Sequence, residues 1–154
     1  GNGTSIPPGD VQRLSAGTGI RHSEFNHAQD SETHFLQIWL LPHTVGIAPG
    51  YEQKHFSVDD KRGILRLVAD KDGQDGAVTI HSDARMYAGL FDGAESAAVA
   101  LDPTRKAYVQ VVKGTITVSG HALAQGDGLL VADYSRLRFD TGVRPHVFLF
   151  CLAA

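Results

Sequence analysis

The sequence has almost no cysteine and no long apolar run, and these shortages already exclude several classes of protein. Cys151 is the single cysteine among 154 residues, so an internal disulfide is excluded, and its apolar neighbours predict a buried, reduced thiol. The longest apolar stretches, around residues 38–41 and 147–150, are far shorter than the ~20 residues of a membrane span. The N-terminus lacks the basic start and apolar core of a signal peptide. We therefore expect a cytoplasmic protein with no membrane partner.

Positive charge is also in short supply. The chain has 14 Lys and Arg against 17 Asp and Glu, a net charge of −3, and no basic cluster. Because binding to a nucleic-acid duplex needs a basic stripe that neutralises phosphates, we expect no direct nucleic-acid partner. The share of hydrophobic residues, 42%, is ordinary for a folded globular protein.

Capped helical periodicity is missing too, while glycine is frequent at 17 residues. The alternating apolar segments between glycines predict strands at residues 33–41, 64–68, 77–80, 106–113 and 115–118, the last two joined tightly at Gly114. Residues 70–76 have the composition of a turn, and residues 83–90 leave room for one helical turn. Many short strands punctuated by glycine indicate an all-β sandwich or barrel.

An internal repeat divides the chain. Gly3 is followed six positions later by Gly9-Asp10, and Gly120 is followed six positions later by Gly126-Asp127. Each pair of markers precedes a mostly apolar strand-like stretch, residues 11–14 and 129–131. A hairpin at residues 108–118 precedes Gly120, but nothing precedes the first marker. We therefore expect the first repeat to lack its front half, with the cut at the turn Gly1-Asn2-Gly3, since Asn-Gly is a strong hairpin signal.

The first repeat carries the residues with metal chemistry. His22 and Glu24 are two positions apart, so on a strand both would point to the same face. An imidazole and a carboxylate together can bind a divalent transition metal, although a stable site needs three or four ligands. An isolated pair of this kind can equally be a solvated pair on the surface. The second repeat has Phe139 and Thr141 at the matching positions, which predicts no metal there.

Longer motifs connect the chain with a known family. The string Ser-Ala-Gly-Thr-Gly-Ile-Arg-His-Ser-Glu-Phe-Asn at residues 15–26, with residues 36–39, 49–53 and 109–128, resembles the pirin family of bicupins. The resemblance implies an all-β fold of two cupin barrels (double-stranded β-helix, or jelly roll), the first one incomplete. Residues 1–50 would be the C-terminal portion of the N-terminal, metal-site cupin. Residues 51–154 would be a linker and the metal-free C-terminal cupin.

The resemblance also implies a ligand set. In the pirin family three histidines and one glutamate hold a single metal, and His22 and Glu24 match the last two of these ligands. The first two come from an upstream His-x-His segment that this sequence lacks. We expect one divalent transition metal (Fe, Ni, Cu, Co, Mn or Zn) in the full-length parent, and none or weak binding in this chain.

The family resemblance implies two alternative functions. Bacterial members are similar to quercetin 2,3-dioxygenases, which open a flavonol ring with O₂; Glu24 would then be both a ligand and the catalytic base that takes the flavonol proton. This chain would be a fragment that is inactive alone. The alternative is a non-catalytic redox or transcription cofactor that binds a protein partner. The residues do not choose between these two.

The remaining histidines and aromatic residues have plainer expected roles. His27 is expected in a surface loop, and His34 in the core or an interface because it shares a strand face with Leu36 and Ile38. Two further histidines, His43 and His55, fall in the connection between the cupins. Phe25 and Trp39 could line a flavonol pocket, but core packing is the favoured role for both.

An incomplete first barrel has a further consequence. Residues 11–41 should expose unpaired strand edges and apolar surface, and such edges pair readily with another chain. We therefore expect self-association into a dimer or a larger assembly.

Overall fold

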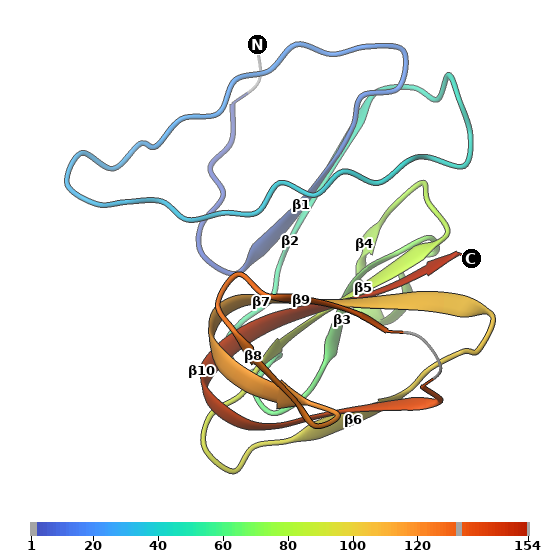
Figure 1. Cartoon of the computed structure of the whole chain (residues 1–154). Helices are drawn as coiled ribbons and strands as arrows, with labels where there is room; N and C mark the ends of the chain where they lie inside the picture. The colour runs from blue at the N-terminus through green and yellow to red at the C-terminus, as the bar shows by residue number, and fades with distance from the viewer. Residues whose placement is uncertain (1–2, 132–133, 154) are drawn as a thin grey trace.

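The computed structural model describes residues 3–131 and 134–153, and nearly all of its regular structure is β (Figure 1). The strands are β1 (Asp10–Ser15), β2 (Gly50–His55), β3 (Arg66–Asp70), β4 (Val78–Thr79), β5 (Ala84–Leu90), β6 (Ala97–Ala100), β7 (Arg105–Val118), β8 (His121–Ala124), β9 (Gly128–Val131) and β10 (Arg136–Ala153), with a 3₁₀ turn η1 (Gln74–Gly76). The all-β prediction is therefore confirmed. Among the described residues no helix is long and apolar enough to span a membrane.

Most strands belong to one eight-stranded sheet. Its main path runs β4-β3-β5-β10-β7-β8, while β6 pairs with β10 and β9 pairs with β7. The central strand β10 is antiparallel to both neighbours, so that Leu149 lies opposite Tyr87 in β5 and Val109 in β7. Because β10 has partners along both edges, its residues form the centre of the molecule.

Alternate residues of β10 enter two different cores. Val147 and Leu149 lie in the larger core with Phe91 and Phe139, whose rings stack at 6.1 Å. Phe150, from the intervening positions, lies in the second core, which also contains buried residues of β3, β4 and β5. The period-two alternation of a strand thus distributes one apolar segment between two faces of the sheet.

The segment around Gly114 differs from the prediction. Instead of two strands with a tight connection, β7 is one long strand with a bend at Gly114, where φ is +70°. A Cβ at this position would lie 2.3 Å from the Val143 carbonyl oxygen, so only glycine fits the bulge. The hairpin turn lies later, at Ser119 and Gly120, which have φ of +47° and +88° as a two-residue type I′ turn requires.

Other local predictions are mixed. Residues 64–68 and 77–80 correspond to β3 and β4 within a few residues, and the turn at residues 70–76 is present and contains η1. The expected helical turn at residues 83–90 is wrong, because that segment is strand β5. Its pairing with β3 on one side and β10 on the other overrides a weak local helical tendency.

The N-terminal part contains only a two-stranded ribbon. β1 pairs with β2 in antiparallel register, and residues 16–49 between them form no strand. Figure 1 shows this segment, drawn blue to teal, as a long open path above the eight-stranded sheet. The strand predicted at residues 33–41 is therefore wrong. Its residue types suit a strand, but no strand among the described residues pairs with it.

The open path exposes apolar side chains. Phe25 is 80% exposed and Trp39 is 88% exposed, so core packing, which we favoured for both, is wrong here. The exposed apolar residues of this region are Leu14, Ile20, Phe25, Phe35, Leu36, Ile38, Trp39 and Leu41. The expectation of apolar surface over residues 11–41 is thus confirmed, and among the described strands β1 pairs with β2 alone.

The internal repeat is visible in the backbone. The Asp10 N–H donates to the Pro7 carbonyl at 3.1 Å, and the Asp127 N–H donates to the Ala124 carbonyl at 2.9 Å. The intervening Gly9 and Gly126 have φ of +98° and +91°. The same turn therefore precedes β1 and β9. The predicted cut at Gly1-Asn2-Gly3 involves residues 1 and 2, which lie outside the described residues.

Candidate functional site

His22 and Glu24 lie on the open path and are exposed. The segment around them is not a strand, so the spacing of two positions does not bring them to a common strand face here. Neither side chain forms a hydrogen bond or ion pair with another described residue. Across residues 3–131 and 134–153, no group of three or more His, Cys, Asp and Glu side chains is arranged to hold a metal ion.

The donor types fit a transition metal, but the number of donors does not. An imidazole and a carboxylate suit nickel, iron or copper, whereas a stable site needs three or four ligands. The described residues thus do not make a complete metal site.

The second repeat shows what the His22 position becomes in a closed barrel. Its counterpart Phe139 lies in β10, is fully buried, and stacks on Phe91 inside the larger core. Thr141, the counterpart of Glu24, lies at a bulge with φ of +53° and is exposed. In the second repeat, the position that matches His22 thus faces the larger core.

The other histidines lie in several settings. His27 is exposed, as predicted for a loop residue. His34 is exposed as well, so the core position expected for it is wrong, while the alternative of an interface stays a prediction. The His43 N–H donates to the His81 carbonyl at 2.8 Å, which ties the end of the open path to the segment that follows β4.

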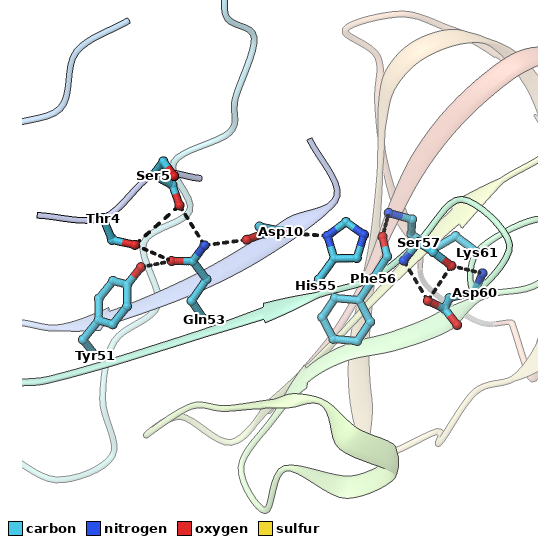
Figure 2. A network of polar contacts seen from close by, with 10 residues as sticks. All are labelled: Thr4, Ser5, Asp10, Tyr51, Gln53, His55, Phe56, Ser57, Asp60 and Lys61. Atoms are coloured by element: carbon cyan, nitrogen blue, oxygen red, sulfur yellow. Dashed lines mark hydrogen bonds and ion pairs between the residues drawn. The ribbon is translucent and has the colours of Figure 1, made fainter. Parts of the chain in front are cut away.

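A polar network that sequence patterns did not reveal runs along the ribbon (Figure 2). The Asp10 carboxylate bonds to Gln53 and lies 2.6 Å from His55 Nδ1. These two hydrogen bonds, from Gln53 and then His55, hold the pKa of Asp10 below its usual value. Gln53 also donates to the Ser5 carbonyl at 3.0 Å, so the network fastens the N-terminal residues to β2.

The network continues to a buried lysine. Lys61 is only 7% exposed, and its Nζ donates to the Phe56 carbonyl at 2.7 Å (Figure 2). Burial lowers its pKa, while the nearby carboxylates of Asp60 and Asp10 act in the opposite direction. The ammonium thus closes the turn after β2 and is not available to a ligand.

A second set of contacts attaches the ribbon to the second barrel. The Thr79 N–H donates to Glu52 at 3.0 Å, Arg13 Nε donates to the Thr79 carbonyl at 3.0 Å, and Lys54 donates to the Ala77 carbonyl at 2.6 Å. Burial raises the pKa of Glu52, but hydrogen bonds from Lys54, Thr79 and Arg13 outweigh it and lower the pKa overall. Glu52 therefore positions the ribbon; it is not a free base.

His146 is the most strongly perturbed histidine. Burial, and then the positive charges of Lys61, Lys113 and His34, lower its pKa to about 4. Its ring lies 5.2 Å from that of Phe148, centroid to centroid. The imidazole is half-buried within β10, where it packs beside Phe148.

Comparison with known proteins gives two family matches. Residues 67–152 match the model of the quercetinase C-terminal cupin domain, and residues 1–40 match the model named pirin. Quercetin 2,3-dioxygenase of Escherichia coli K12 is 35% identical over 152 residues, which is 99% of this chain and 64% of that protein. The chain thus spans less than two thirds of the length of this relative.

Solved structures agree with these matches. The crystal structure of the bacterial pirin YhhW from Escherichia coli in complex with nickel(II) superimposes with a TM-score of 0.90 at 35% identity, covering 99% of this chain and 65% of that one. Quercetin 2,3-dioxygenase from Acinetobacter baumannii, at 15% identity and a TM-score of 0.58, covers 73% of this chain and 43% of its own and shares the fold. The predicted cupin fold is confirmed.

Proposed function

Because this chain belongs to the pirin family, we propose that it contributes to a metal-dependent dioxygenase of the quercetin 2,3-dioxygenase type. The observation that carries the proposal is the Gly-Thr-Gly-Ile-x-His-Ser-Glu motif at residues 17–24, in a chain 35% identical to a protein named for this activity. The nickel(II) complex of a relative supports a divalent metal in the same role. The substrate class that follows is a flavonol-like small molecule.

Two residues have assigned roles in this proposal. His22 is a metal ligand, and Glu24 is a ligand and the base that accepts the proton of the flavonol hydroxyl. The metal, when bound, would supply Lewis-acid and redox chemistry. Residues 1–50 belong to the metal-site cupin, and residues 51–154 are a linker and a metal-free cupin.

This chain alone should bind metal weakly and should not turn over flavonol. Both donors are exposed, and the described residues bring no third donor to them. The missing donors would have to come from a further polypeptide segment or from a second molecule. The chain on its own therefore behaves as an inactive fragment.

Metal content is the deciding measurement. The purified chain is equilibrated with iron, nickel or copper, desalted and measured by elemental mass spectrometry, beside the variant His22→Ala and the matched control His27→Ala. We expect a metal-to-chain ratio near zero for all three proteins. A ratio near one that His22→Ala abolishes would show that other groups complete the site. It would overturn the inactive-fragment proposal and make an aerobic flavonol assay the next experiment.

Partner binding is the second function that a specific observation favours. Phe25 and Trp39 are 80% and 88% exposed on the same open path, and exposed aromatic side chains are typical of interfaces. Self-association would cover this surface. Sedimentation at several protein concentrations tests it: a single monomeric species at all concentrations would contradict self-association.

The cytoplasmic location stays a prediction.

A further inference from the structure

The second barrel has a free sheet edge that the proposed dioxygenase chemistry does not use. β6 pairs with β10 along one side, and no other described strand pairs with its second side. Ala98 and Ala100 of β6 are exposed, so this edge is open to solvent. Natural proteins often blunt such edges with charges, prolines or bulges, but β6 has the sequence Ala-Ala-Val-Ala in unbroken register with β10. The edge can therefore accept another strand.

The hydrogen-bond pattern shows which backbone groups of β6 face outward. The Leu101 N–H donates to the Ser135 carbonyl at 2.9 Å, in the same register as the pairing of β6 with β10. In an antiparallel pair every second residue directs its N–H and C=O to the partner strand, so Val99 does so as well. Ala98 and Ala100 therefore direct their N–H and C=O groups away from β10, and no hydrogen bond joins these groups to a described residue.

Two arginines lie beside this edge. Arg138 is opposite Ala98 and Arg136 is opposite Ala100, so the side chains of each pair share one face of the sheet. This is the outer face, because Leu137 between the two arginines is fully buried in the larger core. An open hollow of about 440 Å³ lies at this place, and it is lined by Ser96, Ala97, Ala98, Arg136 and Arg138.

Positive charge at the hollow is only partly balanced. Asp140 accepts a hydrogen bond from Arg138 Nε at 2.7 Å, while the other guanidinium nitrogens of Arg138 have no partner among the described residues. Arg136 is exposed and forms no ion pair with a described residue, and no described acidic residue lines the hollow. Since guanidinium groups form strong hydrogen bonds with carboxylates, this surface favours acidic side chains.

A second copy of this chain fits the edge less well than an acidic segment does. If two β6 strands paired with each other, the arginines of both copies would meet across the new sheet, and such like-charge neighbours are destabilising. An acidic strand meets no such repulsion. It would lie about 9.6 Å from β10, which is two strand spacings, and the short alanine side chains of β6 leave this gap open for an arginine and an acidic side chain to meet.

We propose that the free edge of β6 binds an extended acidic segment of a partner protein, which joins the sheet as an antiparallel strand. Acidic residues at alternate positions of this segment lie opposite Ala98 and Ala100 and pair with Arg138 and Arg136. The backbone groups of β6 hold the segment, and the two arginines select its acidic sequence. The site uses no residue of the metal motif, so it does not depend on the dioxygenase proposal.

Fluorescence anisotropy of a labelled peptide tests the proposal on the full chain. The probe is a short peptide that alternates glutamate with threonine. One control peptide has lysine in place of glutamate. A second keeps the glutamates but carries a methyl group on each of their backbone nitrogens, which are the groups that would bond to β6. We expect saturable binding of the probe, and binding of both controls weaker by about tenfold or more at the same ionic strength. No saturable binding of the probe, or equal binding of either control, would overturn the proposal.

Proline variants test the backbone contact. Ala98→Pro removes an outward N–H without breaking a hydrogen bond to β10, a position at which edge strands accept proline. The matched control is Ala122→Pro in β8, which has β7 as its one partner among the described strands. The two-residue turn before β8 makes Val118 and His121 a hydrogen-bonded pair, so Ala122 also faces outward. We expect Ala98→Pro to weaken binding of the probe by about tenfold or more, and Ala122→Pro to leave it unchanged.

Arginine variants test the charge. Arg136→Gln should weaken binding of the probe by roughly fivefold. Arg144→Gln, at an exposed arginine outside the hollow, should leave it unchanged. Circular dichroism shows whether each variant is folded, and where Ala98→Pro does not fold, the arginine pair decides. Equal effects of a variant and its matched control would refute the site. Self-association that Arg136→Gln strengthens, measured by sedimentation, would show that a second copy occupies the edge and would equally overturn the proposal.

Discussion

Replacing Gly114 by alanine should destabilise the second barrel far more than an ordinary loop substitution. Gly114 has φ of +70°, and a Cβ there would lie 2.3 Å from the Val143 carbonyl oxygen and 2.6 Å from that of Arg144. Close carbon–oxygen contacts in proteins are about 3.3 Å, so β7 and β10 would have to separate by about 1 Å. The separation falls at the bulge where Lys113 and Thr115 of β7 pair with β10.

The expected loss follows from two contributions. Alanine in the left-handed region costs roughly 1–2 kcal/mol, and one or two weakened backbone hydrogen bonds cost about 0.5–1.5 kcal/mol each. Gly114→Ala should therefore lower the free energy of unfolding by about 2–5 kcal/mol. Gly120→Ala is the matched control, because Gly120 has φ of +88° but no atom within 4 Å of the added Cβ. It should lose only the conformational part, about 1–2 kcal/mol.

Urea unfolding followed by far-ultraviolet circular dichroism measures both losses as shifts of the midpoint at unchanged slope. The decisive quantity is the difference between the two variants, since both carry the same backbone strain. A Gly114→Ala variant no less stable than Gly120→Ala would refute the steric argument and the assignment of β7 as one continuous strand.

Three further predictions concern the core, the half-buried histidine His146 and the open path. Leu149 is fully buried in β10, so Leu149→Ala should lower the free energy of unfolding by about 2–5 kcal/mol. Leu130 is 69% exposed, so Leu130→Ala should lower it by less than about 0.5 kcal/mol. Similar losses for the two variants in the same urea assay would contradict the placement of the core. His146 has a folded-state pKa of about 4, below its ordinary 6.5, so the unfolded chain binds the proton more tightly and stability should fall as pH drops from 6.5 to 4. His146→Gln should reduce that fall, and a nuclear magnetic resonance titration of the ring gives the pKa directly; a pKa near 6.5 would count against burial. Trp39, the single tryptophan, should emit like a water-exposed indole at low protein concentration and shift to the blue as self-association covers it; a blue-shifted emission at the lowest concentration would show that the open path is packed.

The sequence predicted the parts of the fold that depend on local chemistry. The paired Gly-Asp markers became two matching turns at Gly9 and Gly126, because a positive φ there requires glycine. Short apolar stretches at residues 11–14 and 129–131 became β1 and β9. Turn residues and alternation act over a few positions, so they are readable without knowledge of distant contacts.

Predictions failed where distant contacts decide the structure. Residues 33–41 have the residue types of a strand but no partner strand, whereas residues 83–90 have a weak pattern and two partners. His34 is exposed for the same reason. The network of Asp10, His55 and Lys61 could not be foreseen either, since it joins side chains through the register of β1 with β2 and the turn that follows.

The candidate site was predictable only as a motif. His22 and Glu24 stand out by residue type, and the resemblance gives them roles, but the geometry of a metal site depends on donors that the described residues do not bring together.

The position of β10 along the chain has a consequence for biosynthesis. Strands β5, β6 and β7 all pair with a segment that begins only at Arg136. A ribosome that makes the chain from its N-terminus releases those three strands before their common partner exists. The edges that these strands present to β10 stay unpaired during this interval, which is when a chaperone would be needed. A nascent chain stalled before residue 136 would lack the centre of the sheet and should be degraded rather than stored as a folded intermediate.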